Sequence, residues 1–230
     1  MKVLFLPKQF ISAVAADVLS DYESRIGQKV CPPVPVEDII EQSLGLRLGF
    51  VDFEKNYGMA DVYGALYVHK KLVAISTTLL DQGSEGRFCF TCAHEAGHWM
   101  LHRHLADTTH RYVPDEAAVF CRAKNAKEPI EWQADYFAGC LLMPEKEVEK
   151  AFHQAFGTDC LELHNVRKTF PTTPFHFDLC VENWCHIAGA VQQAGGFSNI
   201  SKQAMIIRLQ DLGWVVNHTG QSMNWRFLRV

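Results

Sequence analysis

The spacing of apolar and polar residues along the chain predicts helices interleaved with short strands. Residues 9–25 carry an apolar side chain at every fourth position from Phe10 to Tyr22, which predicts an amphipathic helix. A shorter helix follows Pro35 and ends at Gly45. The stretches LRLGFVDF and GALYVHKKLVAIS then predict short strands, the last two joined by a polar turn. Together these patterns predict a small, mostly antiparallel sheet.

Stronger helical patterns follow the predicted sheet. The first helix is expected over residues 84–104, and a second opens at Pro129, because proline is well tolerated in a first helical turn. Pro144 ends the second helix and begins a third. Between the first two, AAVFCRA predicts a further strand, and residues 179–194 and the stretch NISKQAMIIRLQDLGW predict helices near the C-terminus.

These elements predict an α+β fold in two parts. Residues 1–150 are expected to form a core with the N-terminal helix, the small sheet and a pair of strong helices packed on it. Residues 151–230 are expected to form a mainly helical region with helix-turn-helix character.

Composition narrows the function classes. The chain has 230 residues, 48% hydrophobic and 21% charged, so it can bury a sizeable core. A net charge of −4 gives no basic surface, and we do not expect direct binding to nucleic acid. The apolar run VLFL near the N-terminus is too short for a signal sequence, and no run reaches the roughly 18 apolar residues of a membrane span. We expect a cytoplasmic protein that does not engage a membrane.

The eight cysteines fit the same compartment. A chain of this length is too long for a disulfide scaffold, so we expect reduced thiols. Cys89 and Cys92 form a Cys-x-x-Cys pair without a second such pair to complete a structural zinc site, and they are expected in the core.

The candidate chemistry lies in TCAHEAGHWMLHRH, residues 91–104. Residues i and i+4 of a helix lie about 40° apart around its axis, so His94 and His98 point the same way and can bind one ion. Glu95 falls beside them, within reach of a metal-bound water. This His-Glu-x-x-His pattern is the signature of zinc peptidases.

A catalytic zinc site takes a third protein ligand, and two residues compete for that place. His104 stands ten residues after His94, but the pattern that uses such a histidine needs a glycine where this chain has Leu101. A continuing helix would carry His104 about 15 Å along its axis, out of reach. His104 and His102 are therefore expected to be exposed or to support the site indirectly, and Glu131 in EWQAD is the favoured ligand.

Glu131 begins a helical stripe that continues through Ala134, Asp135 and Ala138. The alanines allow this helix to approach a partner helix closely. Asp135, one turn after Glu131, can accept a hydrogen bond from the outer nitrogen of a ligating histidine. The alternative is a solvated helix face, but the flanking aromatic residues indicate burial, and buried carboxylates without a cation are costly.

Two longer stretches, RFCFTCAHEAGHWMLH and EWQADYFAGCLLMP, resemble the ImmA/IrrE family of zinc metallopeptidases. VPVEDIIEQSLGLRLGFVDF and LVAISTTL are similar to the part of that family before the metal helix, so the resemblance covers residues 30–145. It implies a zincin-like pair of active-site helices and one zinc ion per chain. The implied ligands are His94, His98 and Glu131.

The same resemblance implies Glu95 as the catalytic base. The spacing of Glu131 and Asp135 is also similar to the thermolysin-type pattern, in which the aspartate braces a histidine. The implied reaction is peptide hydrolysis, with Glu95 taking a proton from a zinc-bound water and passing it to the leaving amine.

Family members are typically cytoplasmic bacterial or phage proteins. Many cleave a partner repressor that has a helix-turn-helix domain, and so switch on stress or mobile-element genes. The implied partner here is a protein substrate, a helix-turn-helix transcriptional repressor encoded nearby. The donor that stabilises the oxyanion stays open, with His110, Tyr112, His153 and His176 as candidates.

Two alternative functions remain, besides a peptidase or aminopeptidase of broad specificity. NISKQAMIIRLQDLGW resembles the second half of a helix-turn-helix, with Ser201 as an N-cap, which would suit a DNA- or partner-binding module. The few basic residues nearby, Lys202 and Arg208, favour a terminal helix packed on the core instead. The other alternative is a zinc-containing regulator with little peptidase turnover.

Overall fold

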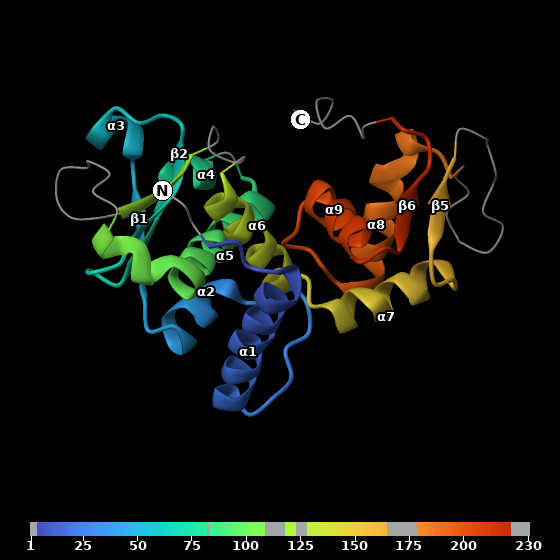
Figure 1. Cartoon of the computed structure of the whole chain (residues 1–230), viewed down its shortest axis with the longest axis horizontal. Helices are drawn as coiled ribbons and strands as arrows, with labels where there is room; N and C mark the ends of the chain where they lie inside the picture. The colour runs from blue at the N-terminus through green and yellow to red at the C-terminus, as the bar shows by residue number, and fades with distance from the viewer. Residues whose placement is uncertain (1–3, 82, 109–117, 123–127, 165–178, 222–230) are drawn as a thin grey trace. The chain divides into compact units, whose positions relative to one another are not determined.

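The computed structural model describes residues 4–81, 83–108, 118–122, 128–164 and 179–221. The chain divides into two compact units, Met1–Leu142 and Met143–Val230 (Figure 1). The fold is α+β, as predicted: a small mixed sheet lies in the first unit, and the second unit is mostly helical. Of the helices within the described ranges, none combines the length and apolar character that a membrane crossing requires.

The first unit contains, in chain order, α1 (Lys8–Ile26), α2 (Val36–Asp38), the π-helix η1 (Ile39–Ser43), β1 (Arg47–Val51), α3 (Phe53–Tyr57), β2 (Val62–Tyr67), β3 (Leu72–Ser76), α4 (Thr77–Asp81), α5 (Glu85–His102), the 3-10 helix η2 (Arg103–Thr108), β4 (Ala118–Arg122) and α6 (Pro129–Leu142). The helices and strands predicted from the sequence in this unit are confirmed, whereas α3 and α4 lie in segments for which no element was predicted. Asp52 caps α3, where its side chain accepts a hydrogen bond from the backbone N–H of Lys55 at 2.9 Å.

The sheet has the strand order β1-β3-β2-β4. β1 pairs with β3 in parallel, and the other two pairings are antiparallel, so the sheet is mostly antiparallel as expected. On one face the central strands pack on Phe53 of α3 through Ala65 and Tyr67. On the other face β2 and β3 contact α5. Coverage of both faces explains why β2 and β3 are apolar along nearly their whole length.

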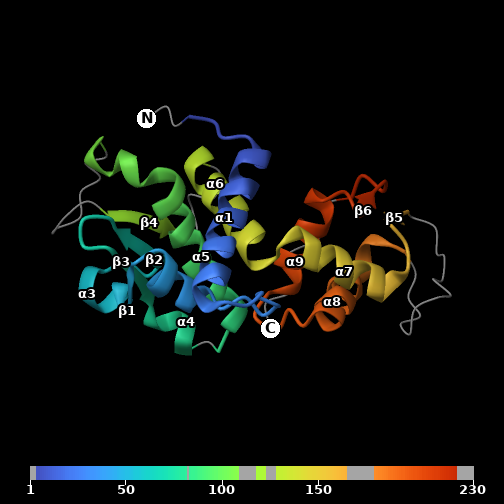
Figure 2. The ribbon, with the colours of Figure 1, turned by 90° about the horizontal axis from the view of Figure 1, so that it is seen from below.

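The helices of this unit form successive layers. α5 contacts the sheet and α6, and α1 packs against α6 (Figure 2). Gly97 permits the close approach of α5 and α6, because a Cβ atom there would lie 3.1 Å from the backbone oxygen of Ala134 and 3.1 Å from the Phe137 ring. Ala134 and Ala138 of α6 are fully buried, in agreement with the small-residue stripe predicted from the sequence.

The second unit contains α7 (Glu145–Phe156), β5 (Leu161–Leu163), the 3-10 helix η3 (Val181–Asn183), α8 (Trp184–Gly195), α9 (Lys202–Asp211) and β6 (Val215–Asn217). Its core joins α7, α8 and α9 through buried apolar side chains such as Phe152, Val191 and Leu209. Ser201 caps α9 as predicted, since its Oγ accepts a hydrogen bond from the N–H of Ala204 at 3.1 Å. The short strands β5 and β6 pair in parallel, and neither was predicted from the sequence.

The contact at Gly97 generates a stability prediction. We expect Gly97→Val to lower the free energy of unfolding by about 1–3 kcal/mol, because the new side chain collides with the backbone of α6. Gly189→Val is the matched control: a Cβ at that position meets only the flexible end of Lys202, at 3.4 Å. The control should change stability by less than about 0.5 kcal/mol. Urea denaturation of both variants without metal measures the difference, and equal effects would contradict the proposed close packing.

Candidate metal centre

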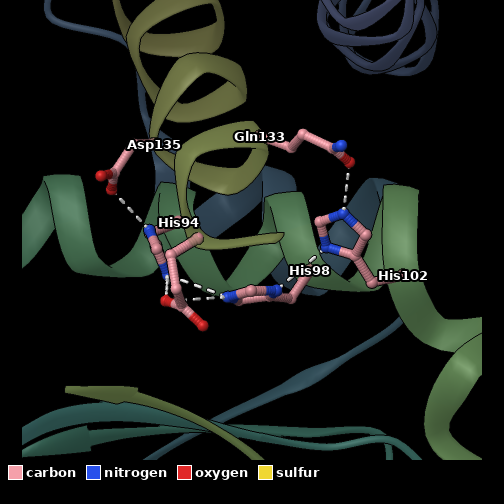
Figure 3. Close-up of polar contacts among 6 residues, drawn as sticks. His94, His98, His102, Gln133 and Asp135 are labelled. Atoms are coloured by element: carbon pink, nitrogen blue, oxygen red, sulfur yellow. Dashed lines mark hydrogen bonds and ion pairs between the residues drawn. The ribbon is translucent and has the colours of Figure 1, made fainter. Parts of the chain in front are cut away.

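α5 presents two histidines of the His-Glu-x-x-His motif on one face, as its helical spacing predicts. The His94 and His98 side chains are almost completely buried, and their Nε2 atoms lie 2.9 Å apart. Both rings lie on the side of α5 that faces α6 (Figure 3). The two nitrogen atoms therefore converge on one point beneath the N-terminal turns of α6.

Glu131, in the first turn of α6, supplies an oxygen to the same point. Its Oε2 lies 3.3 Å from His94 Nε2 and 3.6 Å from His98 Nε2, and its side chain is buried. Ligands about 2.1 Å from a tetrahedral zinc ion lie about 3.4 Å from one another. The three separations in this cluster, 2.9, 3.3 and 3.6 Å, are distributed around that value. His94, His98 and Glu131 thus form a candidate metal site with two nitrogen donors and one oxygen donor.

The charge states of Glu131 and His98 also favour the binding of a cation. Burial raises the pKa of Glu131, but hydrogen bonds and charge interactions with His94 and His98 outweigh it and lower that pKa to about 2. The carboxylate is therefore ionised. Burial lowers the pKa of His98, which favours a neutral ring with one lone pair. A carboxylate and two nitrogen atoms packed this closely in a buried space need a proton or a metal cation between them.

Asp135 fixes the orientation of His94. The Nδ1–H of His94 donates to Asp135 Oδ1 at 2.8 Å, which leaves the Nε2 lone pair of His94 directed at the candidate site. Asp135 lies one turn after Glu131 on α6, so a single helix supplies both a candidate ligand and the acceptor that orients another. This is the arrangement that the sequence predicted for Asp135, and outer carboxylates of this kind make a histidine a better ligand.

Glu95 directly follows His94 on α5, and its side chain is directed at the sheet. It is fully buried, and a Cβ atom at Gly64 of β2 would lie only 2.7 Å from Glu95 Oε1. Neither of its carboxyl oxygens has a hydrogen-bond partner among the residues that the structure describes. Burial raises the pKa of Glu95 to about 8; the Glu131 carboxylate also raises it, whereas His94 opposes the shift. The two glutamates next to the histidines therefore differ by several pKa units.

The two remaining histidines of the motif segment have different surroundings. α5 continues through Leu101 and ends at His102, and His104 is exposed in the following 3-10 helix. His102 is buried one turn after His98, and its Nδ1 lies 3.0 Å from His98 Nδ1. Its Nε2–H donates to Gln133 Oε1 at 2.9 Å. Sequence reasoning included His102 only as an indirect support and missed Gln133, although the i, i+4 spacing of His98 and His102 was a visible signal.

The sequence also offered other candidate residues. His110, Tyr112 and His176, proposed as oxyanion donors, lie outside the described residues, and His153 belongs to the second unit. Cys89 and Cys92 are buried free thiols, as expected for core residues. A second group with ligand-type side chains lies in the second unit, at Glu162, His164 and His218, of which Glu162 and His218 are exposed. Water competes freely for such exposed groups, so the buried cluster is the stronger candidate.

Comparison with known families agrees with this geometry. The sequence profile of the family Peptidase_M78, described as the IrrE N-terminal-like domain, matches residues 42–170, more than half of the chain. The matched segment includes both helices that carry the candidate ligands. A search of the curated proteins finds no match.

The ligand assignment predicts which variants lose metal. After loading with zinc and gel filtration, we expect one equivalent in the native chain and a loss of affinity above about 100-fold in Glu131→Ala, because losing an outer partner alone costs about 10–100-fold. His104→Ala is the control and should keep its metal. Mass spectrometry of the metal content measures both. Loss of metal in His104→Ala with retention in Glu131→Ala would contradict the assignment.

Proposed function

The chain belongs to the Peptidase_M78 family, and we propose that it is a zinc-dependent endopeptidase that hydrolyses a peptide bond in a protein substrate. The observation that carries this proposal is the convergence of two histidine nitrogen atoms from α5 and an ionised carboxylate from α6, with a second glutamate, Glu95, beside the histidines on α5. Those are the parts that metal-assisted hydrolysis needs.

The two glutamates have separate roles in this proposal. Glu131, with its pKa lowered to about 2, is suited to stay ionised as a ligand. Burial raises the pKa of Glu95 to about 8 without a bound cation, and a cation at the neighbouring site would lower that pKa and favour the carboxylate that accepts a proton. Bound zinc would supply the Lewis acid that lowers the pKa of a water molecule. Glu95 accepts the proton of that water on a carboxyl oxygen and returns it to the nitrogen of the leaving amine.

The sheet offers a place for an extended substrate. β4 is an outer strand of the sheet, and among the described residues it pairs with β2 alone. Its neighbour β2 contains Gly64, which contacts Glu95. A substrate segment added along the outer edge of β4 would lie one strand away from β2, which borders Glu95, and main-chain hydrogen bonds would hold it in an extended form.

For the substrate we propose a helix-turn-helix transcriptional repressor encoded nearby, cleaved in the cytoplasm during a stress response. The resemblance of the metal segments to the ImmA/IrrE family supports this choice. The cysteines that the structure describes are free thiols, which fits a reducing compartment. The domain assignment follows: the peptidase core includes α5 and α6, and the helical C-terminal region has a role still to be defined.

Direct DNA binding by the C-terminal region gains no support. Of the two basic residues near its candidate recognition helix, Arg208 is buried, and its Nε donates to the backbone oxygen of Met143 at 3.2 Å. Lys202 remains at the surface, but one lysine in an acidic chain supplies few phosphate contacts. A zinc-containing partner-binding regulator without turnover is the remaining alternative, and the following experiment separates it from a peptidase.

The proposal predicts a cleavage-deficient variant that still binds metal. The zinc-loaded chain is incubated with the purified repressor, and mass spectrometry follows fragments whose masses sum to the substrate plus one water. We expect cleavage at one site by the native chain and a rate lower by about 100- to 10,000-fold in Glu95→Gln. Glutamine matches the shape of a protonated glutamate, so the variant should keep its fold and its zinc.

Controls separate the alternatives. An unrelated helix-turn-helix protein and denatured casein test whether cleavage is specific to the repressor or broad. Equal cleavage by the native chain and Glu95→Gln would exclude Glu95 as the base. Stable binding of the repressor by the zinc-loaded native chain, with no fragments, would contradict the peptidase function and favour a binding regulator.

A further inference from the structure

A hydrogen-bond chain connects the backbone of the N-terminal segment to a candidate metal ligand. The Nε2 amide group of Gln133 donates to the backbone oxygen of Leu4 at 2.9 Å, and Gln133 Oε1 accepts from His102 at 2.9 Å. His102 in turn contacts His98, with their Nδ1 atoms 3.0 Å apart. Figure 3 shows His98, His102 and Gln133 in sequence along α5 and α6.

The direction of each hydrogen bond in this series follows from the first one, between Gln133 and Leu4. A backbone carbonyl oxygen accepts and cannot donate, so the NH₂ end of the Gln133 amide must face Leu4. The oxygen end of the same amide then faces His102. The side chain of Gln133 is fully buried, so water does not compete for either end.

The proton positions on the two histidines follow in turn. Because Gln133 Oε1 accepts, His102 carries its hydrogen on Nε2. The His102 ring is buried, and a neutral ring that donates from Nε2 carries a lone pair on Nδ1. His98 must then donate from Nδ1, and a neutral His98 keeps its Nε2 lone pair, the atom that lies 2.9 Å from His94 Nε2.

We propose that Gln133 and His102 are positioning residues that hold His98 in the tautomer able to bind the metal, and that the backbone oxygen of Leu4 sets the direction of this relay. The inference rests on the proposed function, because it assigns a role to the ligand side of the same metal centre. It adds two residues and a main-chain group that the His-Glu-x-x-His and Glu-x-x-x-Asp motifs do not contain.

The relay has two possible polarities, and one of them prevents metal binding. If the Gln133 amide turned over, its NH₂ group would face His102, which would then accept at Nε2 and donate from Nδ1. His98 would accept at Nδ1 and carry its hydrogen on Nε2, where it would block coordination. The carbonyl of Leu4 therefore selects the binding-competent polarity over a distance of three hydrogen bonds.

The N-terminal segment is held in place by a second contact beside this carbonyl. The Phe5 ring stacks on Trp132 of α6, with ring centroids 6.0 Å apart and planes 9° from parallel. Trp132 directly precedes Gln133, so stacking and hydrogen bond act on the same helical turn. The segment before α1 thereby becomes part of the support of the metal centre, although it lies more than 120 positions from Gln133 in the sequence.

The two ligating histidines are consequently supported in different ways. His94 donates to the carboxylate of Asp135, whose side chain is 43% exposed. His98 donates to the buried ring of His102, and His102 in turn donates to the buried side-chain amide of Gln133. A neutral acceptor beside His98 avoids placing another buried charge next to Glu131.

Zinc affinity tests the relay in the full-length chain. Competition with a chromogenic chelator at neutral pH compares the native chain with His102→Phe and Gln133→Leu, which keep the side-chain volume but remove the acceptor. We expect each variant to bind zinc about 10- to 100-fold more weakly. His104→Phe, at an exposed position on the next turn, is the matched control and should match the native chain.

A spectroscopic readout separates positioning from a general loss of stability. Long-range ¹H–¹⁵N correlation of the histidine rings in the zinc-loaded native chain should show His98 protonated at Nδ1 and bound through Nε2. His102 should be neutral and protonated at Nε2. Coordination through His98 Nδ1, or a hydrogen on His102 Nδ1, would overturn the inference, whether or not the variants fold.

The outcomes also distinguish this inference from the proposed function. Absence of zinc binding by the native chain would contradict the proposed metal centre itself. Stoichiometric zinc in the native chain, with native affinity in both His102→Phe and Gln133→Leu, would contradict the relay but still support the metal centre. A native chain that binds zinc but cleaves no repressor would contradict the peptidase function without contradicting the relay.

Discussion

Electrostatic repulsion in a buried space is the constraint on which the first unit depends. α5 and α6 bring an ionised carboxylate and histidine nitrogen atoms, all from buried side chains, to within 2.9–3.6 Å of one another. The helices can approach this closely because Gly97 and Ala134 face each other. Without a cation this arrangement would be costly, and with one it becomes a set of metal ligands. The packing of α1 on α6 and of α5 on the sheet holds the two helices together.

The surroundings of the site shift the pKa values of two glutamates in opposite directions. Glu131 faces the histidines and has its pKa lowered to about 2, whereas Glu95 faces β2 and has its pKa raised to about 8. Neighbouring titratable groups whose pKa values are separated by their environments are typical of acid–base catalysis. The contact of Glu95 with Gly64 shows how the sheet takes part, because a strand without a side chain at that position leaves room for the carboxyl group.

Local periodicity was sufficient to predict the centre of this site. The i, i+4 spacing placed His94 and His98 on one helical face, and the alanine stripe of EWQAD indicated that Glu131 and Asp135 approach another helix. Both features act within one helix, so the sequence displays them directly. The geometry places Asp135 beside His94 as predicted, and leaves His104 exposed on the helix that follows α5.

The relay and the small second sheet could not be predicted in this way. Gln133 joins His102 across 31 positions and Leu4 across 129, and no local pattern reports such tertiary contacts. β5 and β6 span three residues each, which is too short for an alternating pattern, and they pair in parallel across more than fifty positions. Residues of this kind acquire their roles from the packing of helices and strands, not from their own sequence neighbourhood.

The central claim is that one ion binds to two histidines and one carboxylate contributed by two helices. Zinc-edge X-ray absorption of the loaded native chain tests it most directly, because multiple scattering from imidazole rings counts the histidine ligands. The account predicts four nitrogen or oxygen neighbours at about 2.0–2.1 Å, two of them imidazole. A third imidazole ligand would contradict the account, and so would a sulfur neighbour at about 2.3 Å.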